Sequence, residues 1–146
     1  MKTTSKHYGL FALLTGVILM IGCDQSSPTR AIPATEKVTN SLKATPWKIN
    51  SVMVDGVSST FFTGMNLTFT NTNYSSTNAT PVWPVSGNWS FTNDAAKAFK
   101  RSDGVEVTID AISETSLALS LNWNKTTLGS GRSESIRGKY IFTFRK

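Results

Sequence analysis

The residues that most often carry nucleophilic or metal chemistry are scarce in this sequence. His7 is its one histidine and Cys23 its one cysteine, and both lie near the N-terminus. A Ser-His-Asp triad, a cysteine protease site and a zinc site with Cys or His ligands each need such side chains inside the folded domain. We therefore expect no catalytic residue, metal site or cofactor in the chain beyond residue 23.

Carboxylates could still provide general acid–base catalysis. Glu106 and Asp110 are four residues apart, and Val105, Val107 and Ile109 alternate with the polar residues of this segment. The spacing predicts both carboxylates on the polar face of a β-strand, where water keeps a carboxylate ionised and unsuited to act as a general acid. We expect a protein that is not an enzyme.

The cysteine has another use, which follows from the residues before it. Lys2 and Lys6 precede an uncharged apolar run from Gly9 to Ile21, a pattern typical of an export signal. The run has about 13 residues, whereas a helix that spans a bilayer needs about 20. The pattern therefore predicts a signal peptide and not a permanent transmembrane helix.

The end of this run resembles the lipobox of bacterial lipoproteins, over Leu19, Met20, Ile21, Gly22 and Cys23. In that family the cysteine sulfur receives a diacylglyceryl group, the signal is cleaved before the cysteine, and the new amine is usually acylated. The resemblance implies that residues 1–22 are a signal peptide. It also implies that Cys23 carries fatty acyl chains such as palmitate, which bind the protein to a membrane. The alternative is an ordinary free thiol, which has no disulfide partner in this chain.

The remaining 124 residues are enough for one domain with its own core. Removing Lys2 and Lys6 from 15 basic residues leaves 13 against nine acidic residues, a formal charge of +4. Basic residues cluster at Lys97, Lys100 and Arg101 and near the C-terminus. We interpret these groups as solvated surface and expect no nucleic-acid partner.

Residues 23–45 form the predicted lipidated tether. The stretch from Asp24 to Ala34 is polar and contains Pro28 and Pro33, so it has little to bury. Val38 and Leu42 are four residues apart, which predicts at most one short helix within residues 35–44.

From Pro46 the hydrophobic period changes to two, which is typical of antiparallel strands with one buried face. The alternating apolar positions are Leu67 and Phe69; Gly87, Trp89 and Phe91; Val105, Val107 and Ile109; Leu117, Leu119, Leu121 and Trp123; and Tyr140, Phe142 and Phe144. Further strands are expected at Trp47–Val54, around Tyr74 and at Ala98–Arg101.

Short turns such as Asp55-Gly56 and Asp103-Gly104 join these segments. Residues 46–146 are therefore predicted to be an all-β domain, preceded by the short helix. About eight sequential strands favour an antiparallel up-and-down barrel, because closure removes the exposed edges. A two-sheet sandwich is the alternative.

The order of features resembles the lipocalin-like domains of small Gram-negative lipoproteins, over roughly residues 44–146. The matching segments are Pro46-Trp47-Lys48-Ile49, Asp55-Gly56, Ser86-Gly87-Asn88-Trp89-Ser90-Phe91, Ser116-Leu117-Ala118-Leu119-Ser120 and Tyr140-Ile141-Phe142-Thr143-Phe144. The resemblance implies a barrel and a pocket, without a known ligand. The Gly-x-Trp opening of eukaryotic lipocalins is absent before Trp47, which argues against retinoid-type ligands.

Three tryptophans are the candidate ligand-binding residues. Trp83 is flanked by Pro81 and Pro84, which predicts a loop at one end of the barrel, while Trp89 and Trp123 lie on apolar strand faces. Two function classes follow. One is a binding module for a small apolar or sugar ligand, and the other is a structural or protein-interaction lipoprotein with a filled barrel.

The residue after the lipidated cysteine bears on location. Asp24 resembles the inner-membrane retention signal of enterobacterial lipoproteins, but other Gram-negative groups do not use that signal. Because the lipocalin-like resemblance points to the second kind of cell, we expect a lipid-anchored envelope protein of the outer rather than the inner membrane.

Overall fold

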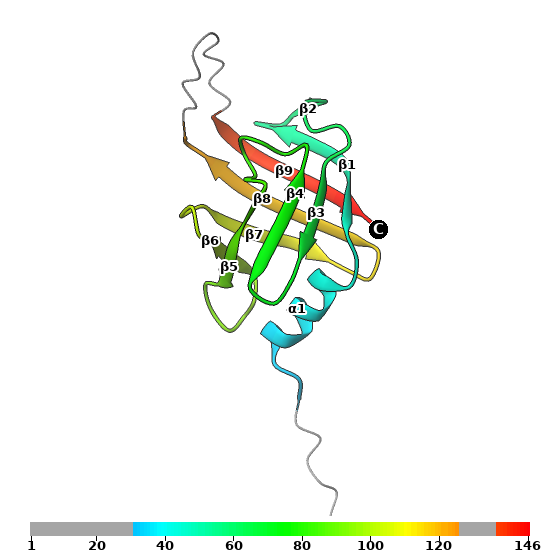
Figure 1. The fold of residues 1–146 in the computed structure, drawn as a ribbon, viewed down its shortest axis with the longest axis vertical. Helices are drawn as coiled ribbons and strands as arrows, with labels where there is room; N and C mark the ends of the chain where they lie inside the picture. Colours follow the sequence, from blue (N-terminus) through cyan, green and yellow to red (C-terminus); the bar gives the residue numbers. More distant parts are fainter. Residues whose placement is uncertain (1–30, 126–136) are drawn as a thin grey trace, which may run out of the picture. The chain divides into compact units, whose positions relative to one another are not determined.

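The computed structural model describes residues 31–125 and 137–146, which form one helix and nine strands (Figure 1). The elements in chain order are α1 Ala34–Lys43, β1 Trp47–Val54, β2 Val57–Ser59, β3 Asn66–Phe69, β4 Asn73–Thr77, β5 Ser86–Phe91, β6 Ala98–Arg101, β7 Glu106–Ile112, β8 Ser116–Trp123 and β9 Gly138–Arg145. The predicted signal peptide, Cys23 and Asp24 lie outside the described residues.

Eight strands form a closed antiparallel barrel. Strands β1 and β3 to β9 pair with their neighbours in chain order, and β9 pairs with β1 from Lys48 to Val54. The predicted up-and-down barrel is therefore confirmed, and the sandwich is not formed. Strand β2 is additional and folds back on the second half of β1 through the turn at Asp55 and Gly56.

The helix covers one end of the barrel (Figure 1). Leu42 is completely buried in the core, and Val38, one turn earlier, packs against it. Glu36 in the first turn and Lys43 in the last complement the helix dipole. The expected short helix is thus confirmed, and its one apolar stripe explains why it lies on the barrel.

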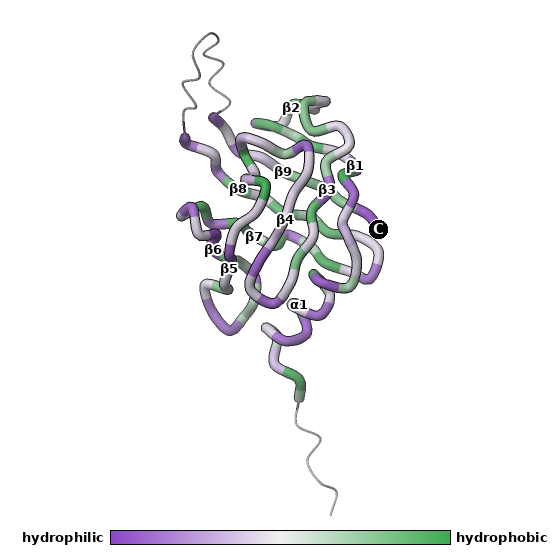
Figure 2. The backbone as a smooth tube through the Cα atoms, in the orientation of Figure 1, coloured by the Kyte–Doolittle hydropathy of each residue, from purple (hydrophilic) through white to green (hydrophobic). Residues whose placement is uncertain are grey.

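The alternating residues fill the barrel interior. Trp89, Leu119 and Phe142 are 4 %, 0 % and 0 % exposed, as the hydrophobic period predicts. In Figure 2, hydrophobic and hydrophilic residues alternate along the strands, whereas most of α1 is hydrophilic. The core is rich in aromatic rings, and Phe142 contacts the rings of Phe62 and Trp83 at centroid distances of 5.3 and 6.1 Å.

Two loops close the barrel end opposite α1. The loop between β2 and β3 buries Phe62 and Met65, and the loop between β4 and β5 buries Val82 and Trp83. The second loop is held to β4 because Ser76 donates its backbone N–H to the Val85 carbonyl at 2.8 Å. These loops bring side chains into the interior that strand periodicity does not reveal.

Candidate binding site around Arg101

Strand β6 places a charged side chain inside the barrel. Phe99 and Arg101 are two residues apart and both are buried, while Lys97 and Lys100 are exposed. The side chain of Arg101 is 0 % exposed. The interpretation of this basic group as solvated surface is therefore correct for the two lysines and wrong for Arg101, because the alternation of β6 turns it inward.

Asp103, in the turn between β6 and β7, holds two of the guanidinium nitrogens. Arg101 donates from Nε to Oδ1 at 3.1 Å and from Nη2 to Oδ2 at 2.6 Å. The turn closes through the Gly104 N–H, which donates to the Arg101 carbonyl at 2.9 Å, and Gly104 adopts the positive φ of +86° that this turn needs. Such a bidentate Arg–carboxylate pair fixes the orientation of the guanidinium.

Lys125, just beyond β8, adds a second positive charge. Its Nζ lies 3.4 Å from Asp103 Oδ2 and donates to the Asp103 carbonyl at 2.8 Å. Partial burial pushes the pKa of Asp103 upward. The hydrogen bonds and charge of Arg101, with smaller contributions from the Val105 N–H and Lys125, outweigh burial and bring this pKa below its usual value.

Three aromatic rings surround the guanidinium. Arg101 Cζ lies 4.6 Å from the ring centroid of Trp83, 5.9 Å from that of Tyr74 and 6.0 Å from that of Trp123. The rings come from the β4–β5 loop, from β4 and from the end of β8. Attraction to the ring faces partly compensates the buried charge. We call Tyr74, Trp83, Arg101 and Trp123 the Arg101 cluster.

Each residue of the Arg101 cluster has one buried polar atom without a hydrogen-bond partner among the described residues. These atoms are Tyr74 Oη, Trp83 Nε1, Arg101 Nη1 and Trp123 Nε1. Indole and guanidinium nitrogens can only donate, so three of the four cannot satisfy one another. Because an unsatisfied buried donor costs about 1–3 kcal/mol, the cluster is suited to a group that brings acceptors.

The position of Tyr74 depends on a glycine. Gly87 is paired with Tyr74 across β4 and β5, and a Cβ at residue 87 would lie 2.7 Å from Tyr74 Oη. The absence of a side chain lets the phenol ring lie across β5 toward Arg101. Burial raises the pKa of Tyr74, the Arg101 charge opposes this shift and Asp103 adds to it, so the phenol stays protonated at neutral pH.

The structure brings together two of the three tryptophans expected at a ligand site. Trp83 and Trp123 belong to the Arg101 cluster, and Trp83 lies in a loop at a barrel end, as expected, but is fully buried. Trp89 is paired with Arg101 across β5 and β6, but its ring packs against Phe69 and Phe99, and its Nε1 donates to the Asn73 carbonyl at 3.2 Å. The sequence feature that could have identified Arg101 as buried is its spacing of two residues from Phe99 in the same strand.

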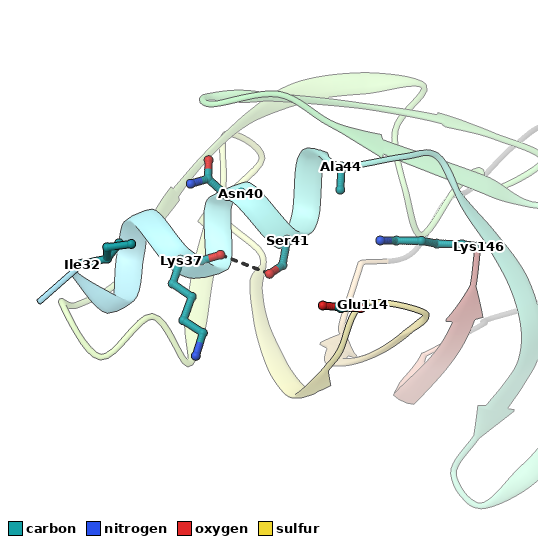
Figure 3. A pocket seen from close by; sticks show the side chains of 7 residues that line it. All are labelled: Ile32, Lys37, Asn40, Ser41, Ala44, Glu114 and Lys146. Atoms are coloured by element: carbon teal, nitrogen blue, oxygen red, sulfur yellow. Dashed lines mark hydrogen bonds between the residues drawn. The ribbon is translucent and has the colours of Figure 1, made fainter.

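Among the described residues, a cavity of about 280 Å³ between β5 and β6 is lined in part by Trp89, Lys100 and Arg101. Two others lie away from the Arg101 cluster. One of about 340 Å³ lies beside α1, where Ser41 and Ala44 face Glu114 and Lys146 (Figure 3). Another of about 280 Å³ lies between the β1–β2 hairpin and the loop that follows it. The cavity beside α1 is an open hollow between exposed side chains and has no buried polar group directed to a ligand.

Comparisons of the chain with protein-family models, curated proteins and solved structures find no match. In residues 31–125 and 137–146, no helix is long and apolar enough to cross a membrane. The same residues contain no group of three His, Cys, Asp or Glu side chains able to hold a metal ion.

Proposed function

We propose that this chain is a lipoprotein of the bacterial cell envelope, anchored in the outer membrane through Cys23, whose barrel binds a small polar ligand at the Arg101 cluster. The lipobox resemblance supports the anchor. The observation that carries the ligand is a set of four buried polar atoms at one guanidinium and the rings around it, none of which has a hydrogen-bond partner among the described residues.

This observation separates the two expected ligand classes. An apolar ligand would leave the indole and guanidinium donors unsatisfied, at a cost for each one. A sugar or another oxygen-rich molecule supplies acceptors for these donors. The arrangement therefore favours the polar class over the apolar class.

A second candidate function is a structural or protein-interaction lipoprotein with a filled barrel. The packed aromatic interior favours it, because Phe62, Phe99, Phe142 and Phe144 are all at most 2 % exposed. In that case the Arg101 cluster would only brace the barrel end. The two candidates differ in whether a soluble ligand changes the tryptophans of the cluster.

Labelling in cells tests the anchor. We expect radioactive palmitate to enter the wild-type protein and the control Met20→Leu, which matches the family's lipobox more closely, but not Cys23→Ser. Equal labelling of Cys23→Ser would contradict the anchor. Recovery of the wild type with the inner membrane would contradict the proposed location.

Fluorescence of the purified full-length lipoprotein tests binding. Saturable changes in tryptophan emission with glucose or acetate, and none with the neutral apolar probe N-phenylnaphthylamine, are the expected result. Saturable binding of the apolar probe alone would reverse the ligand class. No saturable change with any of the three would favour the structural candidate.

A further inference from the structure

We propose that the acceptor bound by the Arg101 cluster is an oxyanion, that is, a carboxylate, sulfate or phosphate group, held by Arg101 Nη1 and the indole N–H groups of Trp83 and Trp123. This inference deepens the proposed function and rests on its ligand-binding half.

The charges at the cluster do not cancel. Arg101 and Lys125 each carry one positive charge, and Asp103, which contacts both, carries one negative charge. The three side chains leave an excess of one positive charge beside a guanidinium that is 0 % exposed. Because burial weakens screening by water and salt, that excess attracts an anion more strongly here than it would on the surface.

The hydrogen-bond capacity matches an anion better than a hydroxyl group. Asp103 occupies Nε and Nη2 of Arg101, so the Nη1 side of the fork stays open to a second acceptor. A carboxylate or phosphate oxygen only accepts, whereas a sugar hydroxyl also donates. Among the four unpartnered atoms of the cluster, only Tyr74 Oη can accept a hydrogen bond from a hydroxyl group. An oxyanion has no such donor to satisfy and can accept hydrogen bonds from all four.

Exposure indicates the side from which an oxyanion approaches. The side chains of Asp103 and Lys125 are 20 % and 48 % exposed, while that of Arg101 is closed to solvent. On the inner side, the Trp83 ring lies edge-on to Tyr74 and to Phe142 within the packed core. A small anionic group therefore enters past Asp103 and Lys125, and any larger remainder of the ligand stays outside the barrel.

The four tryptophans provide a direct test with internal controls. The indole N–H of Trp47 donates to the Leu42 carbonyl at 2.8 Å and that of Trp89 to the Asn73 carbonyl, whereas those of Trp83 and Trp123 have no partner in the described part of the chain. We would record the four indole N–H signals of the full-length lipoprotein in detergent by ¹H–¹⁵N NMR. Sodium acetate, sulfate and phosphate would each be titrated against sodium chloride at equal ionic strength.

We expect at least one of the three anions to shift the Trp83 and Trp123 signals saturably, while the Trp47 signal, from the α1 end of the barrel, stays in place. Trp83→Phe should weaken binding of that anion roughly tenfold, the loss expected for one hydrogen bond to a charged group. Trp47→Phe, a matched control at the α1 end of the barrel, should leave the affinity unchanged. Arg101→Lys should abolish the saturable shift if it folds, and Trp83→Phe serves as the test if it does not.

Three outcomes would overturn the inference. The first is that all four signals stay unchanged with every anion, and the second is that all four drift together without saturation. The third is that glucose shifts the Trp83 and Trp123 signals while the anions do not. That third result would reject the oxyanion and leave the proposed ligand-binding function standing.

Discussion

The two ends of the barrel each bury a tryptophan completely, yet they treat its indole N–H in opposite ways. At the α1 end, Trp47 donates to the Leu42 carbonyl at 2.8 Å. At the other end, Trp83 is equally buried and its Nε1 has no partner within the described residues. Burial alone does not distinguish a residue that stabilises the fold from one suited to a ligand, whereas hydrogen-bond satisfaction does.

The contacts at the α1 end stabilise the fold. The indole of Trp47 satisfies a carbonyl of the last helical turn, which the helix itself leaves without a partner. Lys43 in the same turn donates to Asn71 Oδ1 at 2.8 Å, in the turn between β3 and β4. Each contact joins the helix to the barrel, so this end is expected to be the more sensitive to truncation.

At the Arg101 end, the unsatisfied donors lower the stability of the fold. A buried polar group without a partner is unfavourable, and within residues 31–125 and 137–146 four occur in the Arg101 cluster. Natural proteins keep such groups satisfied in the great majority of cases, so a cluster of exceptions calls for a functional explanation.

The largest expected effect is at the α1 end. Trp47→Ala should lower the free energy of unfolding by about 3–5 kcal/mol, because it leaves a large cavity and removes the bond that fixes α1. Urea denaturation would measure it. The exposed neighbour Lys48→Ala is the control and should change little. A loss in Trp47→Ala as small as in this control would mean that α1 does not contribute to stability.

Gly87→Ala should come next, at the Arg101 end. The new Cβ would lie 2.7 Å from Tyr74 Oη and 2.9 Å from two ring carbons, so the ring must move, at a cost of about 1–3 kcal/mol. Adding Tyr74→Phe should recover part of the loss, because it removes the nearest atom. Ser86→Ala in the same strand should be nearly neutral, and an equal loss there would show that the effect does not come from Tyr74.

A matched pair compares the two ends directly. Trp47→Phe and Trp83→Phe remove the same atoms from fully buried sites, but only the first breaks a hydrogen bond to another residue that the structure describes. In buffer that contains only chloride salts, Trp47→Phe should cost about 1 kcal/mol more than Trp83→Phe. Equal losses would mean that the two indole groups are equivalent, and the comparison between the ends would fail.

Much of the fold could be predicted because its strands alternate regularly. Strands β1 and β6 begin and end at the predicted residues, and the helix was expected within one residue of its bounds. Strand β2 was missed because Val57–Ser59 is too short to show a period, and because Val57 and Ser58 are both exposed. Period-two patterns therefore identify long, half-buried strands and overlook short ones at an edge.

The candidate site was only half predicted. Trp83 and Trp123 were identified by residue type, while Arg101 was assigned to the surface because charged residues usually lie there. The spacing from Phe99 placed it inward, and in this strand the alternation outweighed the usual preference of the charge for water. Which rings meet Arg101 could not be predicted, since the β4–β5 loop that carries Trp83 has no period.

The smallest expected effect concerns the exposed side of the Arg101 end. A carboxyl whose pKa is lower in the folded than in the unfolded chain stabilises the fold above its unfolded pKa of about 3.9, and this contribution is lost as pH falls through the folded pKa. Asp103 is such a group, and the charge of Lys125 helps to lower its pKa. Lys125→Met should therefore lower the free energy of unfolding by less than about 1 kcal/mol at neutral pH. It should also slightly raise the pH at which the stabilising contribution of Asp103 is lost on acidification. Urea titrations between neutral pH and about pH 3 would measure both effects, with Lys100→Met at an exposed position as the control. If stability depends on pH in the same way in the two variants, Lys125 does not act on Asp103.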